Sequence, residues 1–292
     1  MIIVQLTGGL GNQLFQYAAG RYLSFIRQTE LKLDLSWYAQ TTENRPYALN
    51  HFRIEAATAT ETEIAQLRHT GLRRLWTRWQ ERSLPYYRKT MYYEPSFAYD
   101  ENFSQAKDNV YLLGYRQSEK YFLPVADLIR RELQLKEKPQ GLNATLAKEI
   151  IHQNSVSLHV RRGDYLSNPV FSRNHPLCSL QYYQRCVSLL TQTISDPHFF
   201  IFSDDPEWAQ EHLQLEFPHT FVTHNGDAKN YEDLHLMSLC KHHILANSSF
   251  SWWGAWLRPS DTKLVYAPSR WFSTPERDTR DLLPSSWIQV ES

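Results

Sequence analysis

The chain opens with Met1–Leu6 (MIIVQL), Thr7–Gly11 (TGGLG) and Asn12–Arg27 (NQLFQYAAGRYLSFIR), and the last of these carries apolar residues at helical spacing. We expect a short buried strand, a glycine turn and a helix in that order. The following Leu31–Leu35 (LKLDL) alternates apolar and polar residues, which predicts a second strand. Strand, turn, helix and strand in succession are typical of a parallel α/β layer.

The same alternation continues along the rest of the chain. The expected strands are Val110–Gly114, Val156–Val160, Phe199–Ser203, His243–Ala246 and, last, Leu264–Ala267. The expected helices are Ala57–Leu67, Ser118–Glu132 with an early interruption at Pro124, Ala144–His152, Leu180–Ser195, Tyr231–Cys240 and Phe250–Leu257. Lys136–Gly141 (KEKPQG) is typical of a linker between two domains, 1–140 and 141–292, and the last ~20 residues are expected to pack back on the first domain.

Composition narrows the class of protein. The 292 residues carry 31 Lys+Arg and 31 Asp+Glu, and this zero balance argues against a nucleic-acid-binding protein. No stretch approaches ~18 consecutive apolar residues, and Met1–Leu6 lacks a basic start, so neither a membrane span nor a signal peptide is expected. Three cysteines without a CxxC pair provide neither a disulfide framework nor a structural zinc site. We therefore expect a reduced, cytoplasmic protein, whose 14% aromatic content with nine tryptophans needs its own explanation.

The first strand ends in a glycine loop, and ligands of open α/β sheets bind beyond the carboxyl ends of strands. Gly9 and Gly11 would let a ligand approach the backbone, and the helix that follows offers N–H groups and a partial positive charge at its start. Gly9 and Gly11 with Asp34 on the next strand imitate a dinucleotide fingerprint, although leucine replaces the third glycine. The alternative is a tight turn in which Asn12 caps the helix.

The strand Val156–Val160 ends in the sequence HVRRGDY, which supplies His159, Arg161, Arg162 and Asp164. Paired arginines at a strand end suit an anionic ligand, because guanidinium groups bind phosphate oxygens bidentately. Asp164 is suited either to orient an arginine or to act as a base. A cluster of surface salt bridges is the competing interpretation.

Acidic residues follow the next strand. Ser203, Asp204 and Asp205 stand where carboxylates accept hydrogen bonds from guanine or ribose, or cap a helix that begins at Pro206. The chain contains no Asp-x-Asp, the motif through which one class of sugar-nucleotide transferases binds a divalent metal. We therefore expect no metal.

Ser248 and Ser249 begin the helix that follows the strand His243–Ala246. The start of this helix is a further place where an anion can bind, and the tryptophans that follow are typical of packing. Taken together, the four polar strand ends fit a phosphorylated nucleotide better than any one of them does.

Three segments resemble the inverting α-1,2-fucosyltransferases of glycosyltransferase family 11. They are Gly8–Ser24 (GGLGNQLFQYAAGRYLS), His159–Tyr165 (HVRRGDY) and Ala246–Leu257 (ANSSFSWWGAWL). Phe202–Trp208 (FSDDPEW) and Ala267–Phe272 (APSRWF) also look like features of this family. The double-arginine motif is similar to that of α-1,6- and protein O-fucosyltransferases as well, so the first and third segments carry the narrower resemblance.

The resemblance implies a GT-B fold, in which two Rossmann-like domains face a cleft. It implies that residues 1–140 take the acceptor and residues 141–292 bind GDP-β-L-fucose. Fucose would be moved with inversion to O2 of a terminal β-galactoside, such as lactose, N-acetyllactosamine or an O-antigen-type acceptor, without a metal or other cofactor. A bacterial, cytoplasmic enzyme is expected, because the animal members are membrane-anchored and no anchor segment is visible here.

The residue roles that the resemblance implies centre on the departing diphosphate. Without a metal, charge on the β-phosphate must be met by fixed cations and N–H groups, for which Arg161 is the first choice and Arg162 the second. The remaining expected contacts are Ser248, Ser249 and Phe250 with the pyrophosphate, His159, Ser203, Asp204 and Asp205 with guanosine, and Gly9, Gly11 and Asn12 with the pyrophosphate or fucose. Asp164 is the candidate base unless it clamps an arginine.

The stretch Arg68–Lys89 carries seven Lys and Arg against one acid, Glu81, and includes Trp76 and Trp79. A solvated helix with some buried aromatics is the plain interpretation, and the alternatives are an acceptor-site lining or a peripheral contact with an anionic inner membrane. Two other functions stay open from the residues alone. They are a nicotinamide-dependent oxidoreductase built on the glycine loop and a non-catalytic carbohydrate-binding protein suggested by the tryptophans.

Overall fold

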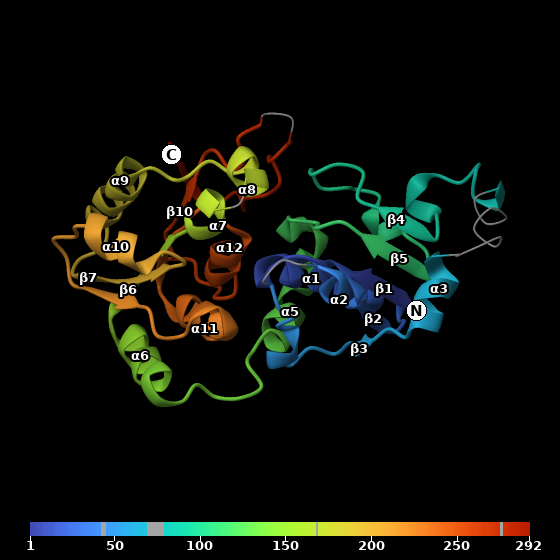
Figure 1. Ribbon diagram of the computed structural model, residues 1–292, viewed down its shortest axis with the longest axis horizontal. Coiled ribbons are helices and arrows are strands. Elements are labelled where there is room, and N and C mark those ends of the chain that lie inside the picture. Colours follow the sequence, from blue (N-terminus) through green and yellow to red (C-terminus); the bar gives the residue numbers. More distant parts are fainter. Residues whose placement is uncertain (42–44, 69–78, 168, 275–276) are drawn as a thin grey trace. The chain divides into compact units, whose positions relative to one another are not determined.

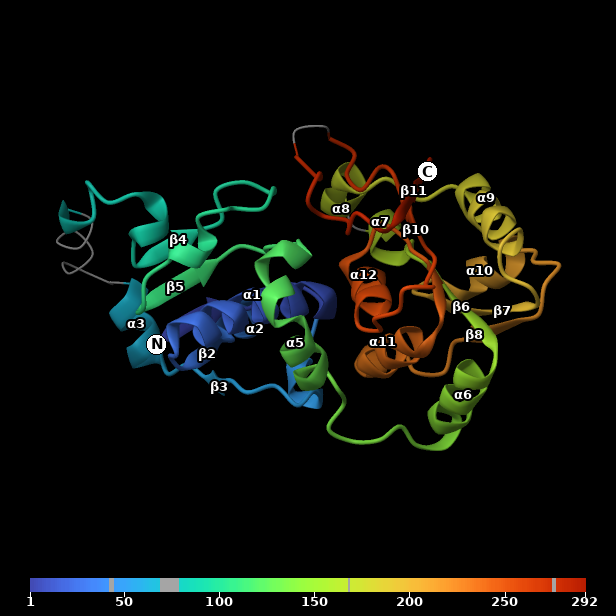
Figure 2. The same cartoon turned by 180° about the vertical axis from the view of Figure 1, so that it is seen from behind.

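A computed structural model describes residues 1–41, 45–68, 79–167, 169–274 and 277–292, apart from the side chains of 164, 167 and 169–171 (Figures 1 and 2). The chain forms two compact units, Met1–Gln134 with Asp278–Leu282 and Leu135–Arg277 with Leu283–Ser292. The first boundary along the chain therefore follows Gln134, earlier than the linker that the sequence indicates.

The first unit is built on a five-stranded parallel sheet in the order β3-β2-β1-β5-β4. Its strands are β1 (Ile2–Gln5), β2 (Leu31–Asp34), β3 (Ala57–Thr58), β4 (Met91–Tyr93) and β5 (Val110–Leu113). Its helices are α1 (Leu10–Arg27), α2 (Ser36–Gln40), α3 (Glu61–Arg68) and α5 (Ala126–Glu132). Helix α1 contacts β1 and β2, while Ile3 and Tyr111 pack with Leu67 of α3.

The second unit contains a six-stranded parallel sheet in the order β11-β10-β9-β6-β7-β8. Its strands are β6 (Asn154–Val160), β7 (Pro197–Ser203), β8 (His219–Val222), β9 (His242–Ile244), β10 (Val265–Pro268) and β11 (Ile288–Val290). Its helices are α6 (Gly141–His152), α7 (Gly163–Ser167), α8 (Pro169–Asn174), α9 (Leu180–Thr191), α10 (Pro206–His212), α11 (Asn230–Leu239) and α12 (Ser249–Trp256).

Alternation along the central strands of the second sheet produces two hydrophobic layers. Leu158 of β6 and Ile201 of β7 pack with residues of α9 and α10 on one face. Phe200 and Phe202 of β7 pack with residues of α6 and α11 on the other face (Figure 1). Because both faces are covered, β7 carries the apolar run Phe199–Phe202, whereas β6 alternates apolar residues with the buried polar residues Ser155, Ser157 and His159.

Tryptophans of α12 form a packed cluster, as the sequence interpretation expects. Trp252 and Trp253 are completely buried, and Trp256 is 4% exposed. The ring of Trp252 lies 6.0 Å from that of Trp256 and 5.4 Å from that of Trp287. These rings account for four of the nine tryptophans and stabilise the helix that follows β9.

Some sequence predictions were wrong in detail. The expected helix Ala57–Leu67 is a two-residue edge strand, β3, followed by the shorter helix α3. The strand at Leu264–Ala267 is not the last one, because β11 follows and pairs with β10. Strands β4 and β8 also had no sequence signal, since each has only three or four residues and is partly exposed.

Both sheets reverse their strand order at one position. In the first sheet β2 and β5 lie on opposite sides of β1, and in the second sheet β7 and β9 lie on opposite sides of β6. Such a switch point leaves space for a ligand beyond the carboxyl ends of the two strands concerned. The residues that follow β1, β6 and β9 are therefore the first place to look for a site. Among the described residues no helix has the length and apolar character needed to span a bilayer.

Candidate functional site

In the second unit the switch point brings together two of the predicted segments. Arg161 and Arg162 follow β6, and Ser248 precedes helix α12, which begins shortly after β9. Strands β6 and β9 are direct neighbours with Leu158 opposite Ile244. The paired arginines and a helix N-terminus therefore meet at the same edge of the sheet.

Asp204 holds the arginine loop in place. Its Oδ1 accepts the N–H of Arg162 at 2.8 Å, and its Oδ2 accepts the N–H of Gly163 at 3.0 Å. The same Oδ2 lies 3.2 Å from Nε of Arg161. A Cβ at Gly163 would lie 3.0 Å from this oxygen, so a larger residue there would press on the carboxylate. One carboxylate thus fixes both the backbone of the loop and the Nε edge of the Arg161 guanidinium.

Arg162 is engaged elsewhere. Its guanidinium carbon lies 3.7 Å from the ring centroid of Trp208 in α10, and its Nε lies 3.6 Å from Oδ2 of Asp205. Asp205 also caps α10 by accepting the N–H of Trp208 at 3.3 Å. The helix-cap interpretation of these acids therefore holds for Asp205 and not for Asp204. Arg162 anchors the loop to α10, which leaves Arg161 as the stronger candidate for a phosphate contact.

The start of α12 contains its own cap. The Ser248 hydroxyl accepts the N–H of Phe250 at 3.3 Å, and the N–H of Ser248 donates to the carbonyl of Ala246 at 2.8 Å. No acidic residue lies in the first turn of the helix. An anion that binds the Phe250 N–H must therefore replace the Ser248 hydroxyl there. The helix dipole favours such an anion.

His159 links the arginine loop to this helix. Its ring centroid lies 5.7 Å from that of Phe250, and the side chain is 3% exposed. Burial, together with the charge of Arg161, lowers the pKa of His159 to about 3. The imidazole is therefore neutral at pH 7, and its Nδ1 has no hydrogen-bond partner among the described residues.

A second polar cluster at this edge was missed by the sequence reasoning. Asp233 in the first turn of α11 accepts Nδ2 of Asn225 at 2.6 Å, and Asn225 accepts Nδ2 of Asn143 in α6 at 2.7 Å. Asn143 also contacts Glu232. Burial raises the pKa of Asp233 to about 7. The adjacent acids Glu232 and Asp233 were the only sequence signal, and they are equally typical of an ordinary first helical turn.

In the first unit the glycine loop is packed by side chains. Gly8 has a φ of +75°, and a Cβ there would lie 2.7 Å from Nδ2 of Asn12. Tyr38 donates its hydroxyl to the carbonyl of Gly8 at 3.1 Å. A Cβ at Gly9 would lie 2.9 Å from Nη1 of Arg45, a cation that the sequence reasoning did not single out. Glycine at these positions therefore serves the packing of the loop.

Helix α1 begins at Leu10, so Asn12 lies inside its first turn and does not cap it. The Asn12 side chain accepts Nε2 of Gln117 at 2.8 Å, and Gly11 is buried. Asp34 is fully buried, where its carboxylate contacts the Tyr111 hydroxyl and accepts the N–H of Ser36 at 2.8 Å. A carboxylate enclosed in this way cannot bind the ribose of a dinucleotide. This removes the basis for the oxidoreductase interpretation.

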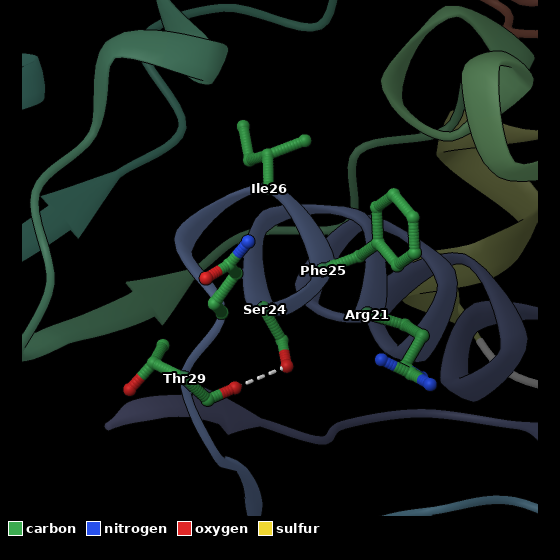
Figure 3. Close-up of a pocket in the computed structure, with 6 residues that line it drawn as sticks. Arg21, Ser24, Phe25, Ile26 and Thr29 are labelled. Carbon is green, nitrogen blue, oxygen red and sulfur yellow. Dashed lines mark hydrogen bonds between the residues drawn. The ribbon is translucent and has the colours of Figure 1, made fainter.

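A surface hollow of the first unit lies away from these sites. An open hollow lined by Arg21, Ser24, Phe25 and Thr29 lies at the far end of α1, about 18 Å along the helix from Asn12 (Figure 3). No group of three or more His, Cys, Asp or Glu within the described parts of the chain is arranged to hold a metal ion. A metal-free reaction stays a prediction.

Two of the predictions concern side chains or residues that the structure does not describe. The Asp164 side chain is among these, so neither of its two proposed roles is decided. Residues 69–78, which include Trp76 and part of the basic stretch, also lie outside the described residues.

Comparison with known proteins identifies the family. The chain matches the description Glycosyl transferase family 11 over residues 1–291. It is 34% identical to an alpha-1,2-colitosyltransferase of Escherichia coli, over 100% of this chain and 99% of that protein. It is 32% identical to the O-antigen biosynthesis glycosyltransferase WbnK of Escherichia coli, over 98% of this chain and 99% of that protein.

The fold has a counterpart among solved structures. The fucosyltransferase NodZ from Bradyrhizobium superposes with a TM-score of 0.53 at 17% identity, over 88% of this chain and 92% of that chain. This likeness confirms the expected GT-B architecture of two parallel-sheet α/β domains. With the match over residues 1–291 and the relatives above, the chain belongs to glycosyltransferase family 11.

Proposed function

We propose that the protein transfers L-fucose, or the closely related sugar colitose, from a GDP-linked donor to O2 of a terminal β-galactoside with inversion. The observation that carries this proposal is the Asp204 carboxylate that fixes Arg161 next to the N-terminus of α12 at the switch point. The motifs that resemble α-1,2-fucosyltransferases and the alpha-1,2-colitosyltransferase among the relatives support the linkage.

The leaving diphosphate is the part of the substrate that most needs the protein. Negative charge grows on the β-phosphate as the bond to the sugar breaks, and fixed donors stabilise it best because they need no reorganisation. We assign Arg161 to this charge, with the start of α12 on the other side of the diphosphate. The Ser248 hydroxyl then exchanges the N–H of Phe250 for a phosphate oxygen.

The guanine base needs a carboxylate or carbonyl that accepts its N–H groups. Asp204 and Asp205 already use their carboxylates within the protein, so their predicted guanosine contacts have little capacity left. Asp233 is the better candidate, because its carboxylate accepts one hydrogen bond, from the side-chain amide of Asn225, and because burial has raised its pKa to about 7. Two donated hydrogen bonds from guanine would favour its charged form.

The first unit is assigned to the acceptor sugar, and its glycine loop is flanked by aromatic rings. Tyr38 contacts the loop, and the rings of Tyr47 and Trp37 lie 6.2 Å and 5.0 Å from its ring. Aromatic rings with polar tips suit sugars, which have apolar faces and hydroxyl edges. Asn12 stays our candidate for a contact with the transferred sugar, and Asp164 our candidate for the base.

A donor panel tests the proposal. Purified protein is incubated with GDP-β-L-fucose or GDP-colitose and with lactose, N-acetyllactosamine or no acceptor, and released GDP and the linkage are measured. Colitose is L-fucose without its 3-hydroxyl, and a site that hydrogen-bonds this hydroxyl would prefer fucose by ~10⁴-fold or more. We expect acceptor-dependent GDP release with one of the two donors. Sugar binding without GDP release for either donor would support a non-catalytic protein instead.

A further inference from the structure

The segment 79–88 leads into β4 in the first unit (Figure 1), and its exposed side chains form a basic aromatic surface. We define it by Trp79, Arg82, Leu84, Tyr86 and Arg88, all of which are exposed. The exposed fractions of its three apolar side chains are 72% for Trp79, 39% for Leu84 and 40% for Tyr86. Isolated exposed apolar side chains are normal, but a large aromatic ring, a leucine and a tyrosine among arginines in one short segment indicate an interaction site.

This segment is held in place by its own hydrogen bonds. The N–H of Arg82 donates to the carbonyl of Trp79 at 3.3 Å, and the N–H of Arg88 donates to the carbonyl of Pro85 at 2.9 Å. Tyr86 donates its hydroxyl to Asp100 at 2.8 Å, which turns the polar tip of the ring inward. These hydrogen bonds fix the backbone of the segment and the ring of Tyr86.

Charge on this surface has one sign. Glu81 is the only acid of Arg68–Lys89. Its carboxylate accepts the N–H of Thr90 and Nζ of Lys107, both at 2.8 Å. These contacts lower the pKa of Glu81 in spite of burial. The acid is thus neutralised by Lys107, while Arg82 and Arg88 remain exposed.

We propose that the basic aromatic surface docks on an anionic phospholipid bilayer. Tryptophan and tyrosine rings bind at the boundary between headgroups and acyl chains, leucine enters the acyl region, and arginines pair with acidic headgroups. Because the segment enters β4 at its amino end, the surface lies at the opposite edge of the parallel sheet from the glycine loop. Docking therefore leaves the proposed acceptor residues uncovered, and the inference does not rest on the proposed reaction.

Nucleic acid is the other polyanion that exposed arginines could bind. It would gain nothing from an exposed leucine, and the chain as a whole has no net positive charge to attract it. A bilayer uses both the apolar and the basic side chains, so the surface fits it better.

Co-sedimentation with vesicles tests the proposal on the full chain. We compare vesicles of phosphatidylcholine alone with vesicles containing roughly 30% phosphatidylglycerol, at about 50 mM and about 500 mM salt. The variants are Trp79→Ser and the double substitution Arg82→Glu, Arg88→Glu. The matched control is Phe25→Ser, which removes a 54% exposed aromatic ring beside Arg21, whose guanidinium is paired with Glu132.

We expect the wild-type protein and Phe25→Ser to bind acidic vesicles at low salt and to release them at high salt. Each basic side chain near an acidic membrane strengthens binding about fivefold, so the double charge reversal weakens it at least ~25-fold. Removing the Trp79 ring weakens it at least about tenfold. Transfer to a soluble acceptor stays unchanged in every variant, and circular dichroism confirms folding.

Equal binding to neutral and acidic vesicles, or wild-type binding by the charge-reversed variant, would overturn the proposal. Binding to immobilised oligonucleotide but not to acidic vesicles would assign the surface to nucleic acid instead. If Trp79→Ser does not fold, the charge-reversed variant decides alone. Vesicle binding by a wild-type protein that shows no transfer in solution would count against the proposed reaction and not against docking.

Discussion

Replacing Asp204 by asparagine tests the clamp that positions Arg161. Asparagine keeps the shape of the side chain and one oxygen, which can still accept the N–H of Arg162 at 2.8 Å. Its NH₂ group then faces two donors, the N–H of Gly163 and Nε of Arg161, where Oδ2 now accepts at 3.0 and 3.2 Å. Two charge-assisted contacts become donor–donor contacts.

The expected size of the effect follows from these two contacts. A hydrogen bond to a charged group contributes about 1.5–3 kcal/mol, and the side chains of Arg161 and Asp204 are 23% and 16% exposed, so solvent screens the pair only partly. A combined loss of about 3–4 kcal/mol, felt mainly when phosphate charge develops, lowers kcat/KM for the GDP-sugar roughly 10²–10³-fold. Because the clamp acts through Arg161, kcat should fall more than KM rises.

The neighbouring acid provides the matched control. Asp205→Asn makes the same chemical change one residue later, but asparagine caps a helix about as well as aspartate, so α10 keeps its cap. We measure GDP release for both variants and their thermal unfolding. If Asp204→Asn retains kcat/KM within about threefold of wild type, or if both variants lose activity equally, Asp204 does not position Arg161.

Four further predictions follow from the site. Arg161→Ala should lower turnover by ~10³-fold or more while far-UV circular dichroism stays native, and near-native turnover would remove Arg161 from the mechanism. For an Asp233 pKa of about 7, the charged fraction rises from about one-tenth at pH 6 to about nine-tenths at pH 8, so GDP-fucose affinity should rise up to ~tenfold. The Asp233→Asn variant should bind GDP-fucose more weakly than wild type, and its affinity should not change between pH 6 and pH 8. Since the pKa of Asp233 is higher in the folded than in the unfolded chain, the unfolded chain loses this proton first. The free energy of unfolding should therefore fall as the pH rises from about 4 to about 7, and this fall should be absent from Asp233→Asn. EDTA should leave turnover intact, whereas a loss restored by Mn²⁺ would show a metal requirement. Gly8→Ala should lower the melting temperature, because alanine is strained at a φ of +75° and its Cβ would lie 2.7 Å from Nδ2 of Asn12.

The sequence predicts those elements best whose burial is continuous. Strands β6 and β7 have seven residues each, nearly all buried. The sequence shows β7 by the apolar run Phe199–Phe202 and β6 by the alternation of valine and leucine with polar residues. Strand β3 has two exposed residues and exists only because its backbone pairs with β2. Its side chains carry no periodic signal, so no pattern could separate it from the helix that follows.

The candidate site divides in a similar way. Arg161 and Ser248 could be predicted because each directly follows or precedes an element with a clear pattern. Asp233 could not, because its environment is made by Asn225 and Asn143, and Asn143 is separated from Asn225 by 82 positions in the chain. The roles of Asp204 and Asp205 could not be separated either. The register that places Val160 opposite Ser203 brings the first of the two acids to the arginine loop and leaves the second to cap α10.

Inward-facing acids explain how a chain without net charge presents basic sites. Asp204 uses its carboxylate on two backbone N–H groups and Nε of Arg161, and Glu81 uses its carboxylate on Thr90 and Lys107. Asp204 thereby orders the loop that carries Arg161 and Arg162. Glu81 orders the segment that carries Arg82 and Arg88. Because backbone N–H groups hold these carboxylates in place, each pairs with one fixed cation, and the local charge is set by placement and not by composition. An acid moved from such an internal position to the surface would leave the net charge unchanged and would remove both the order of the loop and its capacity to bind an anion.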